Sequence, residues 1–252
     1  MEKVFTGKTT DSIQAIYKLG NKVVNWYLIE SVSEIYIIDT GFAGFWKQFV
    51  DAMQKIKRSF NEVSAVLLTH AHLDHTGFAE RARQRTTAEV YIHESGAGTV
   101  TFEHFDIPAE LSSNLWRPKT FTSFLTQAIK NDAFKVKPVG LVKPFKDNEK
   151  LNFPGNPKAI YTPGHSIDHS AFYLEDLGIL FSGDALCTSS PITLRKYPPH
   201  VMKAGDDTVL ATKSLKAFAE IEDVLMLPGH GEPWVGNLNK ETEKIVGRGV
   251  LL

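Results

Sequence analysis

The sequence predicts an α/β fold, on the evidence of its composition and of two alternating kinds of segment. Of the 252 residues, 42% are hydrophobic and 23% are charged, which is an ordinary balance for a soluble globular protein. Short runs rich in β-branched and aromatic residues alternate with segments whose apolar residues recur at helical spacing. Such alternation is typical of β-sheets that are covered by helices. We therefore expect residues 1–252 to form a single domain.

The first half of the chain carries the clearest elements. Strands are predicted at residues 25–30, 34–39, 63–69 and 88–93. Residues 42–59 predict a helix, because apolar side chains recur at helical spacing at Phe45, Phe49, Ala52, Met53 and Ile56. A shorter helix is predicted at residues 78–85, so strands and helices alternate through this half.

The second half resumes this alternation after an irregular segment. Residues 95–150 contain several aromatic side chains, no clean strand and one helical stretch near residues 112–130. This segment is too apolar to be disordered, so we interpret it as a mostly helical or irregular insertion. Strands are then predicted at residues 158–162, 170–175, 178–184 and 223–231, with an amphipathic helix at residues 206–222.

Charge and composition exclude several classes of function. The formal net charge of −1 gives no electrostatic reason to expect nucleic acid or an anionic membrane as a partner. No apolar run is long enough to span a bilayer, and the first residues lack the apolar core of a secretory signal. Cys187 is the only cysteine, which favours a reducing compartment. We expect a cytoplasmic protein with a small-molecule substrate, and a homodimer stays open because homodimers are common.

Three of the nine histidines crowd into the six residues that follow the strand predicted at 63–69. His70 and His72 are two residues apart, so on extended chain their side chains project to the same side and can converge on one ion. Asp74 and His75 follow where the chain turns towards a helix, and they can serve a neighbouring position. Imidazole nitrogen and carboxylate oxygen together suit zinc, manganese or iron. The spacing therefore predicts a metal site.

Three further ligand candidates follow predicted strands in the second half. His165 stands in TPGH, Asp184 in SGD and His230 in PGHG. A glycine before each of these two histidines lets the backbone turn sharply and bring the imidazole close to another segment. Together with the first cluster they make a set of candidate ligands at strand ends that is large enough for two ions with a bridging carboxylate.

The motif H-x-H-x-D-H, followed by TPGH, SGD and PGHG, closely resembles the metallo-β-lactamase-fold hydrolase superfamily. The resemblance covers about residues 25–234, apart from the 95–150 segment. It implies a four-layer αββα sandwich of two mixed β-sheets flanked by helices, with a dinuclear metal site at one edge. The ligands that it implies are His70, His72 and His165 for one ion, Asp74, His75 and His230 for the other, and Asp184 as the bridge.

A dinuclear site of this kind implies hydrolysis. Two ions roughly 3.5–4 Å apart can trap a water molecule, lower its pKa towards neutrality and hold the resulting hydroxide between them as the nucleophile. The ions also polarise the oxygen of the scissile bond and stabilise the charge that develops there. Asp74, beside this hydroxide, could orient it and receive a proton as the catalytic residue. We expect two divalent ions, zinc first, with iron or manganese as alternatives.

Differences between this sequence and individual members of the superfamily narrow the range of expected substrates. Glyoxalase II enzymes and quorum-quenching lactonases share the seven-ligand set. β-Lactamases generally lack a bridging aspartate where Asp184 stands, which argues against antibiotic hydrolysis. The lactonases commonly carry a tyrosine three residues further on, where this sequence has Cys187, a residue that we expect to pack as a small buried side chain. We therefore expect a small ester, thioester or lactone.

Substrate contacts are expected from the irregular segments, because binding residues concentrate on loops mounted on a rigid scaffold. Three apolar and two polar side chains are candidates, namely Phe102, Phe105, Trp116, Arg195 and Tyr197. An apolar wall favours an acyl or aromatic group, and the polar pair could contact a head group. The aromatic residues could equally cover the core or form a dimer contact.

Two further polar residues have competing interpretations. Asp39 resembles a family position near the metals, where it would hydrogen-bond a ligand, but it could also be a plain turn carboxylate. His169 is close in sequence to His165 and has no place in the seven-ligand set, so we expect it on the surface at the start of a strand.

Two other functions stay open. A mononuclear iron enzyme of the persulfide dioxygenase type uses the same scaffold but would leave several of the seven ligands idle. A non-catalytic metal-binding sensor would be indicated by missing ligands, and the sequence retains all seven. Metal content separates the first alternative from the hydrolase, and turnover of an ester separates both enzymes from the sensor.

Overall fold

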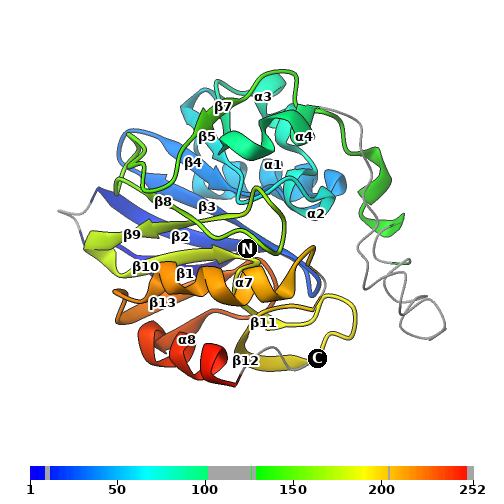
Figure 1. The fold of residues 1–252 in the computed structure, drawn as a ribbon. Helices are drawn as coiled ribbons and strands as arrows, with labels where there is room; N and C mark the ends of the chain where they lie inside the picture. The colour runs from blue at the N-terminus through cyan, green and yellow to red at the C-terminus, as the bar shows by residue number, and fades with distance from the viewer. Residues whose placement is uncertain (9–11, 102–125, 127–128, 204, 249–252) are drawn as a thin grey trace.

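The computed structural model describes residues 1–8, 12–101, 126, 129–203 and 205–248 (Figure 1). Its first sheet has seven strands in sequence order, with β1 at Glu2–Thr6, β2 at Ile13–Gly20, β3 at Asn25–Ser31, β4 at Ile35–Ile38, β5 at Val63–Leu67, β6 at Glu89–His93 and β7 at Lys143–Phe145. Neighbouring strands pair antiparallel from β1 through β4. From β4 through β7, neighbouring strands pair in parallel. The carboxyl ends of β4, β5 and β6 therefore meet at one edge of the sheet.

The second sheet has five strands in the order β14-β13-β10-β9-β8. Their bounds are Lys158–Tyr161 for β8, Ser170–Leu174 for β9, Ile179–Gly183 for β10, Asp223–Pro228 for β13 and Trp234–Asn237 for β14. The strands β10 and β13 are parallel, so the residues that follow them lie side by side. A separate two-stranded ribbon joins β11 (Cys187–Ser189) to β12 (Lys196–His200).

Helices lie on the outer side of each sheet (Figure 1). Among the described residues, the α-helices with defined bounds are α1 at Trp46–Ile56, α2 at Leu73–Thr76, α3 at Ala79–Arg85, α4 at Ala97–Thr101, α7 at Thr208–Ser214 and α8 at Leu238–Gly247. Short 3-10 segments are η1 at Ala43–Phe45, η2 at Phe60–Glu62, η3 at Glu94–Gly96, η4 at Ala133–Lys135, η5 at Glu175–Leu177 and η6 at Leu215–Phe218. Within this described part of the chain, no helix combines the length and the apolar character that crossing a bilayer requires.

Side chains of β3 show how the layers are held together. Because successive side chains of a strand point to opposite faces, Trp26 and Leu28 pack in one buried cluster with Phe49 of α1. Tyr27 and Ile29 point the other way, into a cluster shared with strands of the second sheet. A third cluster joins the far face of the second sheet to η6 and α8. The result is the predicted four-layer αββα sandwich, which the structure confirms.

The structure also contains strands and one helix that the sequence patterns did not predict. The strands β1, β2, β11, β12 and β14 and the helix α8 were not expected. The strand β7 lies in the 95–150 segment, where no strand was predicted, and it pairs in parallel with β6. It has only three residues and contains Pro144, so no strand pattern can develop there. The helical stretch near 112–130 falls almost entirely outside the described residues, and the division into one domain with an insertion stays a prediction.

Candidate metal centre

The histidine cluster lies where β5 leaves the first sheet. His70 is fully buried, three residues after the end of that strand. His72 keeps an extended backbone, with φ −66° and ψ 149°, and directly precedes α2, which carries Asp74 and His75. The backbone changes from extended to helical after His72. The side chains of His70 and His72 therefore point to one position, and those of Asp74 and His75 point to another.

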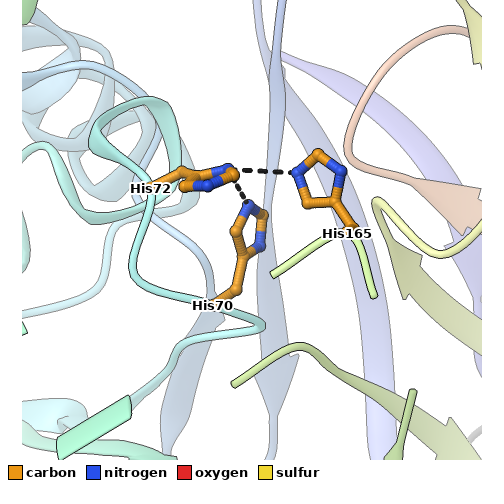
Figure 2. Close-up of side chains that lie close together, drawn as sticks. All are labelled: His70, His72 and His165. Carbon is orange, nitrogen blue, oxygen red and sulfur yellow. Dashed lines mark hydrogen bonds between the residues drawn. The ribbon is translucent and has the colours of Figure 1, made fainter. Parts of the chain in front are cut away.

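Three imidazoles meet at the first of these positions (Figure 2). Nε2 of His70 is 3.0 Å from Nδ1 of His72, and Nε2 of His165 is 3.0 Å from the same atom. His165 comes from the connection between β8 and β9, so the second sheet contributes to this group. Three ring nitrogens that face one another at this distance could bind one ion together.

A second group forms around His75 and His230. Oδ2 of Asp74 is 3.9 Å from Nε2 of His75 and 3.6 Å from Nε2 of His230. Asp74, His75 and His230 could hold an ion as a group, and His70, His75 and Asp184 form another such combination.

Asp184, which follows β10, lies between the two groups. Its Oδ2 is 3.2 Å from Nε2 of His165 and 2.9 Å from Nε2 of His230, while its Oδ1 is 3.6 Å from Nε2 of His75. The structure therefore brings all seven predicted ligand side chains together, with the carboxylate of Asp184 between imidazoles of the two groups.

Two effects shift the pKa values of candidate ligands, namely burial and the charges of neighbouring side chains. Burial disfavours the ionised form of Asp184, but the imidazoles of His230, His75 and His165 hold its pKa well below the usual value. Burial would also lower the pKa of His75 and His230, yet Asp184 and the neighbouring carboxylates raise both values. Burial above all lowers the pKa of His70 and His165, which favours the neutral form of both imidazoles.

His75 provides a direct test of whether these residues fit a metal ion. Its Nδ1 lies 2.8 Å from Oδ2 of Asp39, whereas its buried Nε2 has no hydrogen-bond partner. A buried polar atom without a partner is costly in a folded protein, and a metal ion would satisfy it. The donor set of imidazole nitrogens and carboxylate oxygens is one that zinc, iron and manganese accept. The residues therefore fit a divalent ion.

The two glycines that precede ligand histidines act in different ways. Gly164 has φ +126°, so the sharp turn expected before His165 is present. Gly229, before His230, has no such backbone conformation. A Cβ at Gly229 would lie 2.3 Å from Oδ1 of Asp184 and 2.8 Å from Cε1 of His75, so glycine is required here for space.

Asp39, at the end of β4, is buried and contacts two segments of the cluster. Its carboxylate accepts hydrogen bonds from the backbone N–H and the hydroxyl of Thr69, both at 2.8 Å, in addition to that from His75. The sequence signalled Asp39 but not Thr69, because a threonine after a strand has no distinctive pattern.

His169 was predicted at the surface, and that prediction is wrong. The side chain is fully buried, and its Nε2 accepts a hydrogen bond of 2.8 Å from the backbone N–H of Asp184. Its Nδ1 is 2.8 Å from the hydroxyl of Thr162. Burial lowers the pKa of His169 to about 3, so the imidazole is neutral and supports the turn that carries Asp184.

Two of the five predicted substrate contacts lie among the described residues. Arg195 and Tyr197 are exposed in the β11–β12 ribbon, and Tyr197 packs against His200 with ring centroids 5.0 Å apart. A backbone hydrogen bond from Thr188 to the carbonyl oxygen of His230 connects the ribbon to the candidate metal centre.

The three apolar candidates Phe102, Phe105 and Trp116 lie outside the described residues. Cys187, as expected, is buried.

Comparison with known proteins identifies the family. A family model described as the metallo-beta-lactamase superfamily matches residues 19–230. The chain belongs to the metallo-β-lactamase superfamily. Its fold is the one that the resemblance to this superfamily predicted.

Individual members of the superfamily resemble the chain at moderate identity. The probable metallo-hydrolase YflN of Bacillus subtilis is 25% identical over 260 residues, which cover 98% of this chain and 96% of that protein. The thioesterase pkgB of Emericella nidulans is 27% identical over 209 residues, which cover 82% of this chain but only 46% of that protein. The crystal structure of the metallo-beta-lactamase family protein TTHA1429 from Thermus thermophilus has the same fold, with a TM-score of 0.65, 24% identity, and coverage of 92% of this chain and 78% of that one.

Proposed function

We propose that the protein is a dinuclear metal-dependent hydrolase that cleaves a small ester, thioester or lactone. The observation that carries the proposal is the place of Asp184, whose Oδ2 lies within 3.2 Å of imidazoles from both candidate groups. A carboxylate in that place could bridge two cations. The superfamily membership and a full-length relative named as a probable metallo-hydrolase support hydrolysis.

The residues that would hold the two ions are those of the two groups. The first ion would take His70, His72 and His165, the second would take Asp74, His75 and His230, and Asp184 would contact both. When bound, two divalent ions would acidify a water molecule and polarise the carbonyl of the scissile bond. Zinc is our first assignment, with iron and manganese as alternatives that the same ligands would accept.

Asp74 is the ligand residue best placed to move a proton. Its side chain is 26% exposed, whereas those of His75 and His230 are almost fully buried. An attacking water molecule must lose a proton, and a carboxylate beside it can accept that proton and release it to solvent. We assign this role to Asp74. Because residues 71–74 are the less buried part of the cluster, the substrate would approach from this side.

A thioester is the substrate bond to test first. The relative pkgB is named a thioesterase, and the 82% of this chain that aligns with it supports a related reaction. Hydrolysis of a thioester needs an acidified water and a polarised carbonyl, which are the features that this centre would supply. We propose that Arg195 and Tyr197 contact the polar part of a small-molecule substrate. The cytoplasm as location and a homodimer as assembly state are parts of the same proposal.

The proposal is tested by metal content and turnover measured on the same preparations. The wild type is compared with His75→Ala and Asp184→Ala, and with Asp51→Ala as the control, because Asp51 is exposed on α1, pairs with Lys47 and belongs to neither group. Elemental mass spectrometry should give two ions per chain for the wild type and the control, and fewer for the two ligand variants. Hydrolysis of thioester, ester and lactone probes should follow the metal content.

Three results would contradict the proposal. One iron ion per chain that neither ligand substitution removes would indicate a mononuclear iron enzyme, which an oxygen-consumption assay with persulfides would then identify. Two ions with no turnover of any probe would favour a metal-binding sensor. Hydrolysis that persists after the metal is removed would exclude metal-dependent catalysis altogether.

A further inference from the structure

The hydroxyl of Thr69 lies between the carboxylate of Asp39 and the candidate ligand His70. Thr69 is fully buried between the end of β5 and His70. Its hydroxyl is 2.8 Å from Oδ2 of Asp39 and 3.0 Å from Nδ1 of His70. The same carboxylate oxygen is 2.8 Å from Nδ1 of His75. One carboxylate thus contacts His75 directly and His70 through a single hydroxyl.

The chemistry of these groups fixes which atom donates in each hydrogen bond. An ionised carboxylate has no proton, so Asp39 accepts from every partner. In the neutral form that metal binding requires, His75 must then carry its proton on Nδ1, which leaves the lone pair on Nε2, the atom that has no hydrogen-bond partner.

The same reasoning extends one step further, to His70. A hydroxyl has one proton, and Thr69 gives it to Asp39. In its contact with His70, the hydroxyl can therefore only accept, so His70 carries its proton on Nδ1. Nε2 of His70 is left with its lone pair and faces Nδ1 of His72 at 3.0 Å. This is the tautomer that a metal ligand at Nε2 requires.

We propose that Thr69 is a positioning residue that relays the orientation set by Asp39 to His70. One carboxylate thereby fixes the tautomers of ligands in both groups, that of His75 directly and that of His70 through Thr69. This inference rests on the proposed dinuclear function. It distinguishes the two groups, because among the candidate ligands the Thr69 hydroxyl contacts His70, a member of the first group, and does not contact His75.

The variant Thr69→Val separates the hydroxyl from the rest of the side chain. Valine keeps the shape of threonine, and the backbone N–H of residue 69 can still donate to Asp39. His70 would lose the acceptor for its Nδ1 proton in a fully buried place. The Nδ1 proton of His70 could then move to Nε2, and a protonated Nε2 cannot bind a metal ion. Loss of such a supporting hydrogen bond typically weakens metal affinity 10–100-fold.

The test is a zinc titration of chelator-treated protein in competition with a chromophoric chelator. For Thr69→Val we expect one of two zinc ions to bind about 10–100-fold more weakly while the affinity for the other is unchanged. Thr69→Ser, which keeps the hydroxyl, should restore both affinities. Thr242→Val is the matched control, because Thr242 is a buried threonine whose hydroxyl donates to the carbonyl oxygen of Asn239 in α8. It should leave both affinities unchanged.

A spectroscopic measurement on the wild type covers the case in which Thr69→Val does not fold. Long-range ¹H–¹⁵N correlation spectra of the imidazoles should show His70 protonated at Nδ1 and not at Nε2. The opposite tautomer overturns the inference.

The outcomes separate this inference from the proposed function. A wild type that binds two zinc ions, together with a Thr69→Val variant that binds both equally well, overturns the role of Thr69 alone. Equal weakening of both ions in Thr69→Val and in Thr69→Ser also overturns it, because that result indicates a general packing role. A wild type that binds fewer than two zinc ions overturns the dinuclear proposal and this inference with it.

Discussion

Asp39→Asn should weaken both candidate metal groups while leaving the fold intact. Asp39 has φ 56°, a left-handed conformation that asparagine adopts as readily as aspartate, so the backbone should not change. The substitution removes the negative charge that accepts from His75 and Thr69. A hydrogen bond to a charged group contributes about 1.5–3 kcal/mol, and about 1.4 kcal/mol corresponds to a tenfold change in affinity. We therefore expect zinc to bind about 10–100-fold more weakly at each site.

The assay is the same chelator competition, with circular dichroism of the metal-free protein as the check on folding. Asp132→Asn is the matched control, because Asp132 also has a left-handed backbone, with φ 54°, and its carboxylate pairs with Lys135 and with no candidate ligand. The control should bind zinc as the wild type does. Wild-type affinity at both sites in Asp39→Asn would refute the account of Asp39, and so would an equal loss in Asp132→Asn.

Three other substitutions test separate parts of the structure. Gly229→Ala should weaken zinc binding without unfolding the protein, because the added methyl would lie 2.3 Å from Oδ1 of Asp184; zinc competition measures this. Glu80→Gln should destabilise the protein at neutral pH, because the hydrogen bonds from Arg83 above all, opposed by burial, hold the pKa of Glu80 below its usual 4.5. That stabilisation is present above pH 4.5 and is lost as the pH falls through the lower folded-state pKa, so urea unfolding should show the difference from wild type shrinking in acid. Phe49→Ala should lower the free energy of unfolding by about 3–5 kcal/mol, because the ring is fully buried.

Each of these predictions has a result that would contradict it. Gly98→Ala, at a glycine with open space around it, is the control for Gly229→Ala, and equal zinc affinities in the two variants would remove the steric argument. For Glu80→Gln, a difference in unfolding free energy that stays constant from neutral to acid pH would exclude the ionised carboxylate as its source. For Phe49→Ala, a loss of less than about 1 kcal/mol would mean that the core between α1 and the first sheet relaxes around the cavity.

The sequence predicted the layers of the fold and the strand ends that carry ligand candidates. The strands β3 to β5 were recognisable because each is a short run rich in apolar residues, many of them β-branched or aromatic. The order of motifs also indicated that His70, His165 and Asp184 would come together, and in the structure they do.

What the sequence could not predict depends on contacts between distant segments. The hydrogen bond from Thr69 to Asp39 forms because β4 and β5 are parallel neighbours in the sheet. The identities of these two residues do not indicate that their strands pair. His169 could not be told from a surface histidine, since its burial depends on the packing of Gly183 and Thr69 around it. The space that Gly229 leaves for Asp184 is likewise invisible until β10 and β13 are placed side by side.

The measurement that tests the central claim most directly is an anomalous difference map from crystals of the zinc-loaded protein, recorded at the zinc absorption edge. The account predicts two peaks for each chain, one among His70, His72 and His165 and one among Asp74, His75 and His230, with the Asp184 carboxylate between them. A single peak, or two peaks that Asp184 does not contact, would contradict the dinuclear centre.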